Sequence, residues 1–196
     1  MKVTILASGR GTNARNILEL QKNGNLPNVE IAAVISDKQD APVLEVAKSY
    51  NVKSIYLDTM KSGAFFSKEG ADFYIQNLQF VCTELVVMAG FMKILPDSIL
   101  NAYKNRIINL HPSLLPAFKG KDAIGQAWNS GAKESGCTVH FASAQLDGGE
   151  IIAQKKVSRL PSDTLETFEA KIHQAEYELL PRVIADIASG KIKIGV

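Results

Sequence analysis

Asn109 and His111, two positions apart, form the strongest candidate for catalysis in the sequence. They end an apolar run expected to be a strand over residues 106–110, and two prolines stiffen the segment 112–116 (PSLLP) that follows. Residues i and i+2 of a strand point to one face, so the amide and the imidazole are expected side by side. Such a pair can donate hydrogen bonds to a developing oxyanion, and imidazole also moves protons near neutral pH. A single histidine at a strand end is usually structural, and the stiffened loop favours the functional reading here.

Asp147 is the carboxylate that could act on this histidine, within the segment 146–150 (LDGGE). An aspartate before two glycines is most often a turn former. The alternative is that Asp147 holds and charges His111, as acids do in catalytic histidine pairs. Both loops can reach one edge of a sheet in the folded chain, so both readings stay open.

A glycine-rich turn, segment 8–14 (SGRGTNA), is a candidate anion site. It joins the first expected strand to the first expected helix, so backbone N–H groups and the positive helix end face the carboxyl edge of the sheet. Glycines such as Gly11 let the backbone approach an anion closely, and Thr12 and Asn13 add polar side chains. The segment also fits the GxGxxA dinucleotide fingerprint, with Asp37 as an approximate acidic partner. A phosphate loop, a nicotinamide cofactor site and a plain tight turn are therefore the alternatives.

Alternating strand-like and helix-like segments position these loops. Strands are expected over residues 2–7, 29–35, 52–57, 84–89 and 106–110, and helices over residues 13–22, 42–50, 68–80 and 96–103. Strands this continuous in Val, Ile and Leu are typical of parallel sheets buried on both faces. The alternation predicts an α/β fold with a doubly wound, mostly parallel sheet.

The last third of the chain predicts an antiparallel addition to that sheet and a long C-terminal helix. A short helix and two strands are expected over residues 122–129, 137–141 and 151–157. An apolar stripe then continues at helical spacing, with Ser162 or Asp163 as the cap. Pro181 is expected to kink or break this helix. Without linkers or repeats, residues 1–196 are expected to form a single domain.

Composition and charge exclude several classes of protein. The chain has 196 residues, and 46% of them are hydrophobic, as in a globular protein. Its formal net charge of +2 is too small for a protein that binds the phosphate backbone of nucleic acids. The two cysteines, Cys82 and Cys137, match no zinc spacing, so reduced thiols and no metal are expected. No segment is apolar and long enough for a signal or a membrane span. These features predict a cytoplasmic protein that binds small molecules, with neither nucleic acid nor membrane as a partner.

Four segments together resemble the phosphoribosylglycinamide formyltransferases, folate-dependent formyltransferases of purine biosynthesis. They are 8–13, 88–95 (MAGFMKIL), 109–116 (NLHPSLLP) and 146–150, and they follow the family's order and spacing over essentially the whole chain. The last two are specific to folate-dependent formyl transfer, and the glycine loop narrows the resemblance to enzymes acting on glycinamide ribonucleotide. It implies transfer of the formyl group of 10-formyltetrahydrofolate to the amine of N1-(5-phospho-D-ribosyl)glycinamide, without a metal.

The resemblance also implies which residues act. Asn109, His111 and Asp147 would be the catalytic trio, with His111 or a water on Asp147 relaying the proton. Residues for the ribonucleotide would be Gly11, Thr12, Asn13 and Glu176. Residues for the folate would be Lys68, Met92, Lys93, Ile94, Leu95, Asn109, Ser143, Ala144, Gln145, Leu146 and Asp147.

Lys68 and Lys93 depart from the family pattern because both stand where arginine is common. Lysine keeps the positive charge and loses the bidentate fork of arginine. Lys119 similarly stands where a proline is frequent, so its loop is expected to be looser. The resemblance further implies a cis peptide bond between Leu115 and Pro116, a departure from the usual trans form.

Two broader expectations complete the sequence analysis. Residues 1–100, approximately, would form a half that binds the nucleotide phosphate, and residues 101–196, approximately, would form a folate and catalytic half. The protein would be a monomer or a homodimer. The alternative function is an NAD(P)-dependent Rossmann-type oxidoreductase. It leaves the segment 109–116 and Asp147 unexplained.

Overall fold

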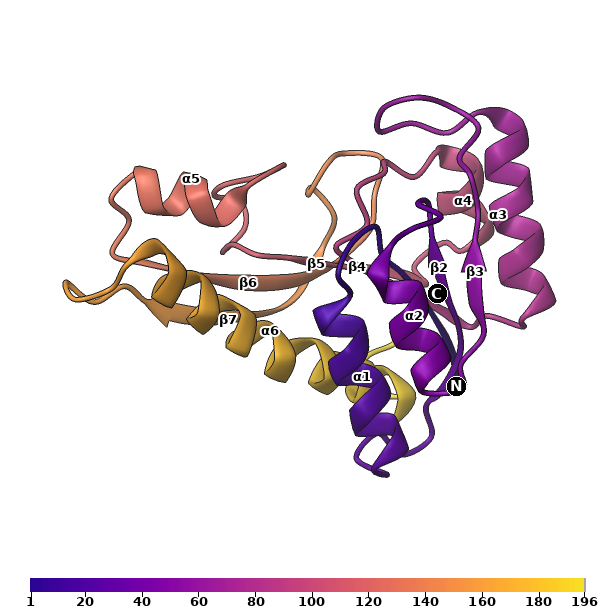
Figure 1. The fold of residues 1–196 in the computed structure, drawn as a ribbon, viewed down its shortest axis with the longest axis horizontal. Coiled ribbons are helices and arrows are strands. Elements are labelled where there is room, and N and C mark those ends of the chain that lie inside the picture. Colours follow the sequence, from indigo (N-terminus) through magenta and orange to yellow (C-terminus); the bar gives the residue numbers. More distant parts are fainter. Residues whose placement is uncertain (196) are drawn as a thin grey trace.

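The computed structural model describes residues 1–195, which form one seven-stranded sheet with helices on both faces (Figure 1). The first five strands are parallel neighbours in the order β3-β2-β1-β4-β5. Their bounds are β1 (Lys2–Leu6), β2 (Glu30–Ser36), β3 (Ser54–Tyr56), β4 (Leu85–Ala89) and β5 (Ile107–His111). The expected doubly wound sheet is confirmed, with β3 shorter than expected.

The two faces of the sheet carry separate hydrophobic cores. One face packs against α1 (Thr12–Lys22), α2 (Pro42–Ser49) and α6 (Leu165–Ala188), and the other against α3 (Lys68–Phe80) and α4 (Asp97–Ala102). Strand β1 shows why: Val3 and Ile5 are wholly buried in the first core, and Leu6 is wholly buried in the second. Both faces of the central strands are apolar because both faces are covered.

The C-terminal third adds two antiparallel strands, as expected. β6 (Glu134–Phe141) pairs with β5, β7 (Ile151–Ser158) forms the sheet's edge, and α5 (Ala123–Asn129) precedes them. The β5–β6 register sets Asn109 opposite His140. The peptide bond between Leu115 and Pro116 is cis, as the resemblance implied.

Helix α6 corrects two expectations about the C-terminus. A kink or a break was expected at Pro181; the helix runs unbroken from Leu165 to Ala188, 24 residues that include Pro181, so a break there is wrong. Pro181 is itself buried, as are residues on both sides of it, and this burial offsets the backbone hydrogen bond that proline removes. The cap is Thr164 rather than Ser162 or Asp163, because Thr164 and Thr167 form a reciprocal capping box.

The loops that carry the candidate residues gather at the carboxyl edge of the parallel strands. The direction of winding reverses between β1 and β4, which are neighbours in the sheet. Ser8 N donates to the Gly90 carbonyl (3.0 Å), and Met92 N donates to Ser8 Oγ (2.8 Å). Open α/β sheets bind ligands at such a switch point. Across residues 1–195, none of the helices is long and apolar enough to cross a membrane.

Candidate active site

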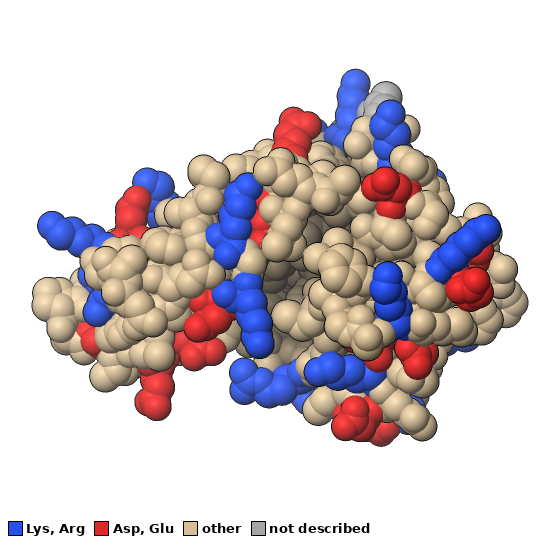
Figure 2. All heavy atoms as spheres, turned by 90° about the horizontal axis from the view of Figure 1, so that it is seen from above, with Lys and Arg blue, Asp and Glu red and all other residues tan. Residues whose placement is uncertain are grey.

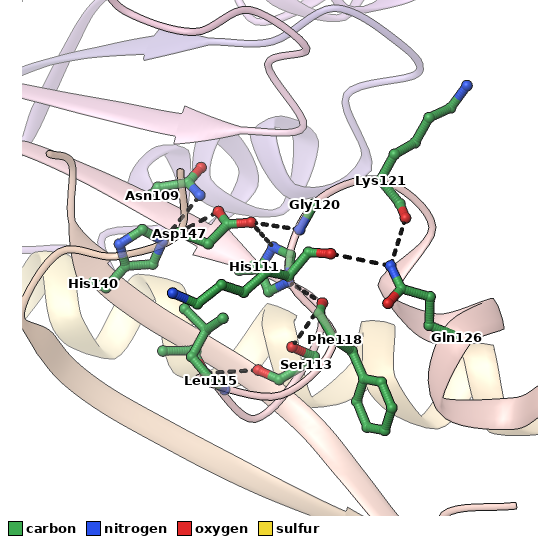
Figure 3. A network of polar contacts seen from close by, with 12 residues as sticks. Asn109, His111, Ser113, Leu115, Phe118, Gly120, Lys121, Gln126, His140 and Asp147 are labelled. Atoms are coloured by element: carbon green, nitrogen blue, oxygen red, sulfur yellow. Dashed lines mark hydrogen bonds and ion pairs between the residues drawn. The ribbon is translucent and has the colours of Figure 1, made fainter. Parts of the chain in front are cut away.

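His111, the last residue of β5, lies between two oxygen acceptors (Figure 3). Its Nε2 is 2.8 Å from the Phe118 carbonyl oxygen, and its Nδ1 is 3.4 Å from Asp147 Oδ2. The side chains of His111 and Asp147 are each 6% exposed, so little water screens the pair. The expected proximity of Asp147 to His111 is therefore observed. Because both ring nitrogens face acceptors, the imidazolium is the form that offers a proton to each.

The Asp147 carboxylate is held from a second side by the loop that follows β5. Gly120 N donates to Asp147 Oδ2 at 2.8 Å, and Asp147 itself has a φ of 46°. Gln126 on α5 donates to the carbonyls of Lys119 and Lys121 and so clamps that loop (Figure 3). Asp147 thus occupies a turn while its carboxylate points at the imidazole.

His140 belongs to the site although the sequence analysis did not include it. Its Nδ1 donates to the Phe141 carbonyl at 2.8 Å, so its Nε2 is free to accept from Asn109 Nδ2 at 3.1 Å. Burial lowers the pKa of His140, which favours this neutral form. The antiparallel register is the signal that would have identified His140, and that register is not visible in either strand alone.

A pocket lined by both apolar and polar residues includes Asn109 and Asp147. Its lining comprises Met88, Lys93, Ile94, Leu95, Leu100, Asn109, His140, Ala142, Ser143, Gln145, Leu146 and Asp147. Most residues expected to contact folate are among them. Lys68, Met92 and Ala144 are not, and Met92 is 61% exposed.

The glycine loop begins α1 in the way an anion site requires. Gly11 is the N-cap, with a φ of +71°, and Thr12 is the first helical residue, its side chain exposed. A Cβ on Gly11 would come within 2.3 Å of Val43 Cγ2, so glycine is required there for packing as well as for conformation. The first amides of α1 and its dipole face the carboxyl edge of the sheet.

Glu176 on α6 joins this loop from the far end of the chain. Its side chain is 5% exposed, and its Oε2 accepts from Asn13 Nδ2 at 2.9 Å. The same oxygen is 2.9 Å from His173 Nδ1, while His173 Nε2 is 3.3 Å from Glu169 Oε1. The hydrogen bond with Glu176 is the main cause of the raised pKa of His173. Asn13 Oδ1 is buried and has no hydrogen-bond partner within residues 1–195.

The two lysines expected near folate have different surroundings. Lys68 is the exposed first residue of α3. The Lys93 ammonium donates to the Gly63 carbonyl at 2.7 Å and lies 3.7 Å from Asp37 Oδ2. Figure 2 shows a hollow in the face seen from above, with Lys and Arg side chains on more than one side of it. Their charge favours the approach of an anionic ligand.

Comparisons with known proteins agree on one family. A family model described as formyl transferase matches residues 1–184. A phosphoribosylglycinamide formyltransferase of Bacillus subtilis is 38% identical over 95% of this chain and 94% of that protein, and one of Escherichia coli is 34% identical over 99% and 90%. A crystal structure of phosphoribosylglycinamide formyltransferase from Bacillus halodurans has a TM-score of 0.90 and 40% identity, covering 98% of this chain and 97% of that one.

Proposed function

Because this chain belongs to the formyl transferase family, enzymes that transfer a formyl group, we propose that it acts on N1-(5-phospho-D-ribosyl)glycinamide in purine biosynthesis. The formyl donor in this proposal is 10-formyltetrahydrofolate. The relatives named for this activity match nearly the full length of the chain, and their names support formyl transfer rather than the oxidoreductase alternative.

The observation that carries the proposal is the pairing of His111 with Asp147 beside Asn109, at the edge of the pocket. The reaction passes through a tetrahedral intermediate whose oxygen becomes negative. The Asn109 amide has a second N–H that would donate to that oxygen. His111, whose ring nitrogens face Phe118 and Asp147 in this structure, would exchange one of those contacts for the oxygen. The Asp147 carboxylate, 3.4 Å from His111 Nδ1, would orient the ring and interact favourably with positive charge on it as the oxyanion forms.

In the proposed reaction, the substrate amine attacks the formyl carbon, and a new C–N bond forms. The bond between that carbon and the folate nitrogen then breaks. The proton lost by the amine moves to the departing nitrogen, through His111 or through a water held by Asp147. No electrons are gained or lost, so no oxidant and no reductant enter this scheme.

The loop at the start of α1 is the proposed site for the substrate phosphate. Backbone amides near Gly11, Thr12 and Asn13 would hold the phosphate at the positive helix end. Glu176, which accepts a hydrogen bond from Asn13, would accept hydrogen bonds from the rest of the ribonucleotide. The unpaired Asn13 Oδ1 supplies a further acceptor there.

The pocket beside Asn109 is the proposed folate site. Its apolar side chains, among them Ile94, Leu95 and Leu146, suit the flat face of a pterin. Ser143, Gln145 and Asp147 add polar groups from the loop after β6. In this proposal each half of the chain also contributes to the other half's site, where the nucleotide half is about 1–100 and the folate and catalytic half is about 101–196. Glu176 serves the first site, and Ile94 and Leu95 serve the second.

The decisive experiment mixes the purified chain with 10-formyltetrahydrofolate and glycinamide ribonucleotide and follows formation of the formylated product. Product should appear with both substrates and be absent when either is omitted. A chain that yields no product but binds a nicotinamide dinucleotide would favour the oxidoreductase alternative. We expect the enzyme to act in the cytoplasm, as a monomer or a homodimer.

A further inference from the structure

Lys93 and Asp37 form an ion pair that the proposed reaction does not explain. Lys93 Nζ lies 3.7 Å from Asp37 Oδ2 and donates to the Gly63 carbonyl at 2.7 Å. The Asp37 side chain is 3% exposed, and its Oδ1 is buried without a hydrogen-bond partner in the described part of the chain, residues 1–195. A carboxylate buried this deeply needs a cation beside it, and Lys93 supplies that charge.

The pair lies where three segments of the chain meet. Asp37 directly follows β2, Lys93 lies in the loop after β4, and Gly63 belongs to the connection between β3 and α3 (Figure 1). Next to the Lys93–Gly63 bond, Ile94 N donates to the Ala64 carbonyl at 2.7 Å. Two consecutive residues of the pocket lining are thus bonded to two consecutive residues of that connection.

We propose that Asp37 is a positioning residue for folate binding. It holds the Lys93 ammonium on the Gly63 carbonyl and thereby fixes the pocket wall at Ile94 and Leu95. This inference rests on the proposed function, because it takes the pocket beside Asn109 as the folate site. In this inference Lys93 acts on folate through the pocket wall, and its side chain does not bind folate directly.

The same pairing accounts for the acidic residue that the dinucleotide fingerprint singled out. In that interpretation Asp37 would face a ribose hydroxyl at the end of β2. In the structure its carboxylate is buried against Lys93 instead. Asp37 therefore binds Lys93 in the loop after β4 and does not face a dinucleotide.

The two roles of Lys93 predict opposite effects of Asp37→Asn. If Lys93 bound the glutamate carboxylates of folate directly, neutralising Asp37 would free the ammonium and tighten binding. If Asp37 positions Lys93, the same substitution weakens folate binding by about tenfold to a hundredfold, because the ion pair that fixes Lys93 is lost. The weakening should be equal for a folate without its glutamate, because it acts through the pocket wall.

The experiment titrates wild type and Asp37→Asn, by calorimetry, with 10-formyltetrahydrofolate and with the same compound lacking glutamate. A matched control is Asp163→Asn, which removes another nearly buried aspartate, 6% exposed, from an ion pair with Lys171, outside the pocket lining. Hydrogen exchange of the Ile94 amide gives a readout independent of activity. Exchange should be faster in Asp37→Asn and unchanged in Asp163→Asn.

The outcomes separate this inference from the proposed function. A wild type that binds neither folate contradicts the proposed function. A wild type that binds both, with Asp37→Asn binding as tightly or more tightly, overturns the positioning role. If Asp37→Asn does not fold, Lys93→Met/Asp37→Asn removes both charges together, and weakening confined to the folate that carries its glutamate would then indicate a direct Lys93 contact and overturn the positioning role. Equal weakening for both folates supports the role, and unchanged binding overturns it.

Discussion

Asp147 is at once a turn residue and a partner of His111. Its φ of 46° lies in the left-handed region, which aspartate adopts more readily than most residues. The sequence context Asp-Gly-Gly therefore correctly indicates a turn. The carboxylate nevertheless faces the His111 ring at 3.4 Å and accepts from Gly120 N. The two interpretations that the sequence offered as alternatives are compatible in one residue.

Replacing Asp147 with asparagine tests its proposed catalytic role. Asp147→Asn keeps an oxygen for Gly120 N and tolerates the left-handed backbone, so the fold should be nearly unaffected. Loss of the negative charge beside His111 should lower kcat by about 10²–10⁴-fold, the range for positioned acid–base groups. Both KM values should change much less, because the lost interaction acts in the transition state. Steady-state kinetics on a variant with wild-type circular dichroism measures this, and near-normal turnover would leave Asp147 as a turn residue alone.

His140 shows what residue types alone could not reveal. Its actual neighbour is Asn109, on a strand whose antiparallel register no local pattern specifies. His140 is a positioning residue in our account, since its Nε2 orients the Asn109 amide.

This orienting role predicts a graded effect of two substitutions. His140→Phe removes the acceptor for Asn109 Nδ2 and should lower kcat about tenfold, less than deleting an oxyanion donor itself. His140→Gln restores an acceptor oxygen, and its kcat should recover toward wild type. The measurement is kcat for both variants at equal folded fraction. Equal losses in the two variants would indicate a packing role instead.

At the scale of elements, a regular apolar spacing was sufficient to predict a helix and its bounds, whereas single residues such as prolines and possible caps were not. Helix α3 has the predicted bounds, Lys68–Phe80, because its cap and apolar spacing agree. Pro181 misled the prediction, because the rule for proline is local and the burial that retains the helix comes from packing against the sheet. The cap at Thr164 was missed for a similar reason, since Ser162 and Asp163 are equally plausible caps in sequence.

The glycine loop offers a matched pair of substitutions that separates folding from binding. Gly11→Ala combines a positive φ with a clash against Val43, so it should lower the free energy of unfolding by about 1–3 kcal/mol. A Cβ on Gly9 meets no atom within 4 Å, so Gly9→Ala should fold normally. If the loop approaches the substrate phosphate, Gly9→Ala raises the KM for the ribonucleotide and leaves the KM for folate unchanged.

Urea denaturation and steady-state kinetics on both variants give the measurements. Gly11→Val would alter fold and binding together, because any Cβ at this position clashes with Val43, and is therefore less informative about binding. An unchanged ribonucleotide KM in Gly9→Ala would contradict the assignment of this loop to the phosphate.

At the scale of the whole molecule, both proposed sites join residues that are distant in sequence. Asn13 and Glu176 are 163 positions apart, and their hydrogen bond links the first helix to the last. The doubly wound pattern predicts that strand ends meet at one edge, so it brings the loops together. Which side chains contact one another at that edge depends on how the helices and loops pack together, and the pattern of strands and helices does not specify this packing. The family resemblance supplied part of that knowledge, while the pairing of Lys93 with Asp37 came from the structure alone.

The two histidines with shifted pKa values predict opposite pH dependences of global stability. The pKa of His173 is raised from 6.5, mainly by its bond with Glu176, so its contribution is full below about pH 6.5 and is lost as pH rises through the raised value. The pKa of His140 is lowered by burial, so the unfolded chain binds more protons, and stability is lost as pH falls below about 6.5. Urea denaturation between about pH 5 and about pH 8.5 compares wild type with His173→Gln and with His140→Gln. The advantage of wild type over His173→Gln should shrink as pH rises, and its advantage over His140→Gln should grow. If the free energy of unfolding of both variants follows that of wild type in parallel over this pH range, the two predicted pH dependences are contradicted.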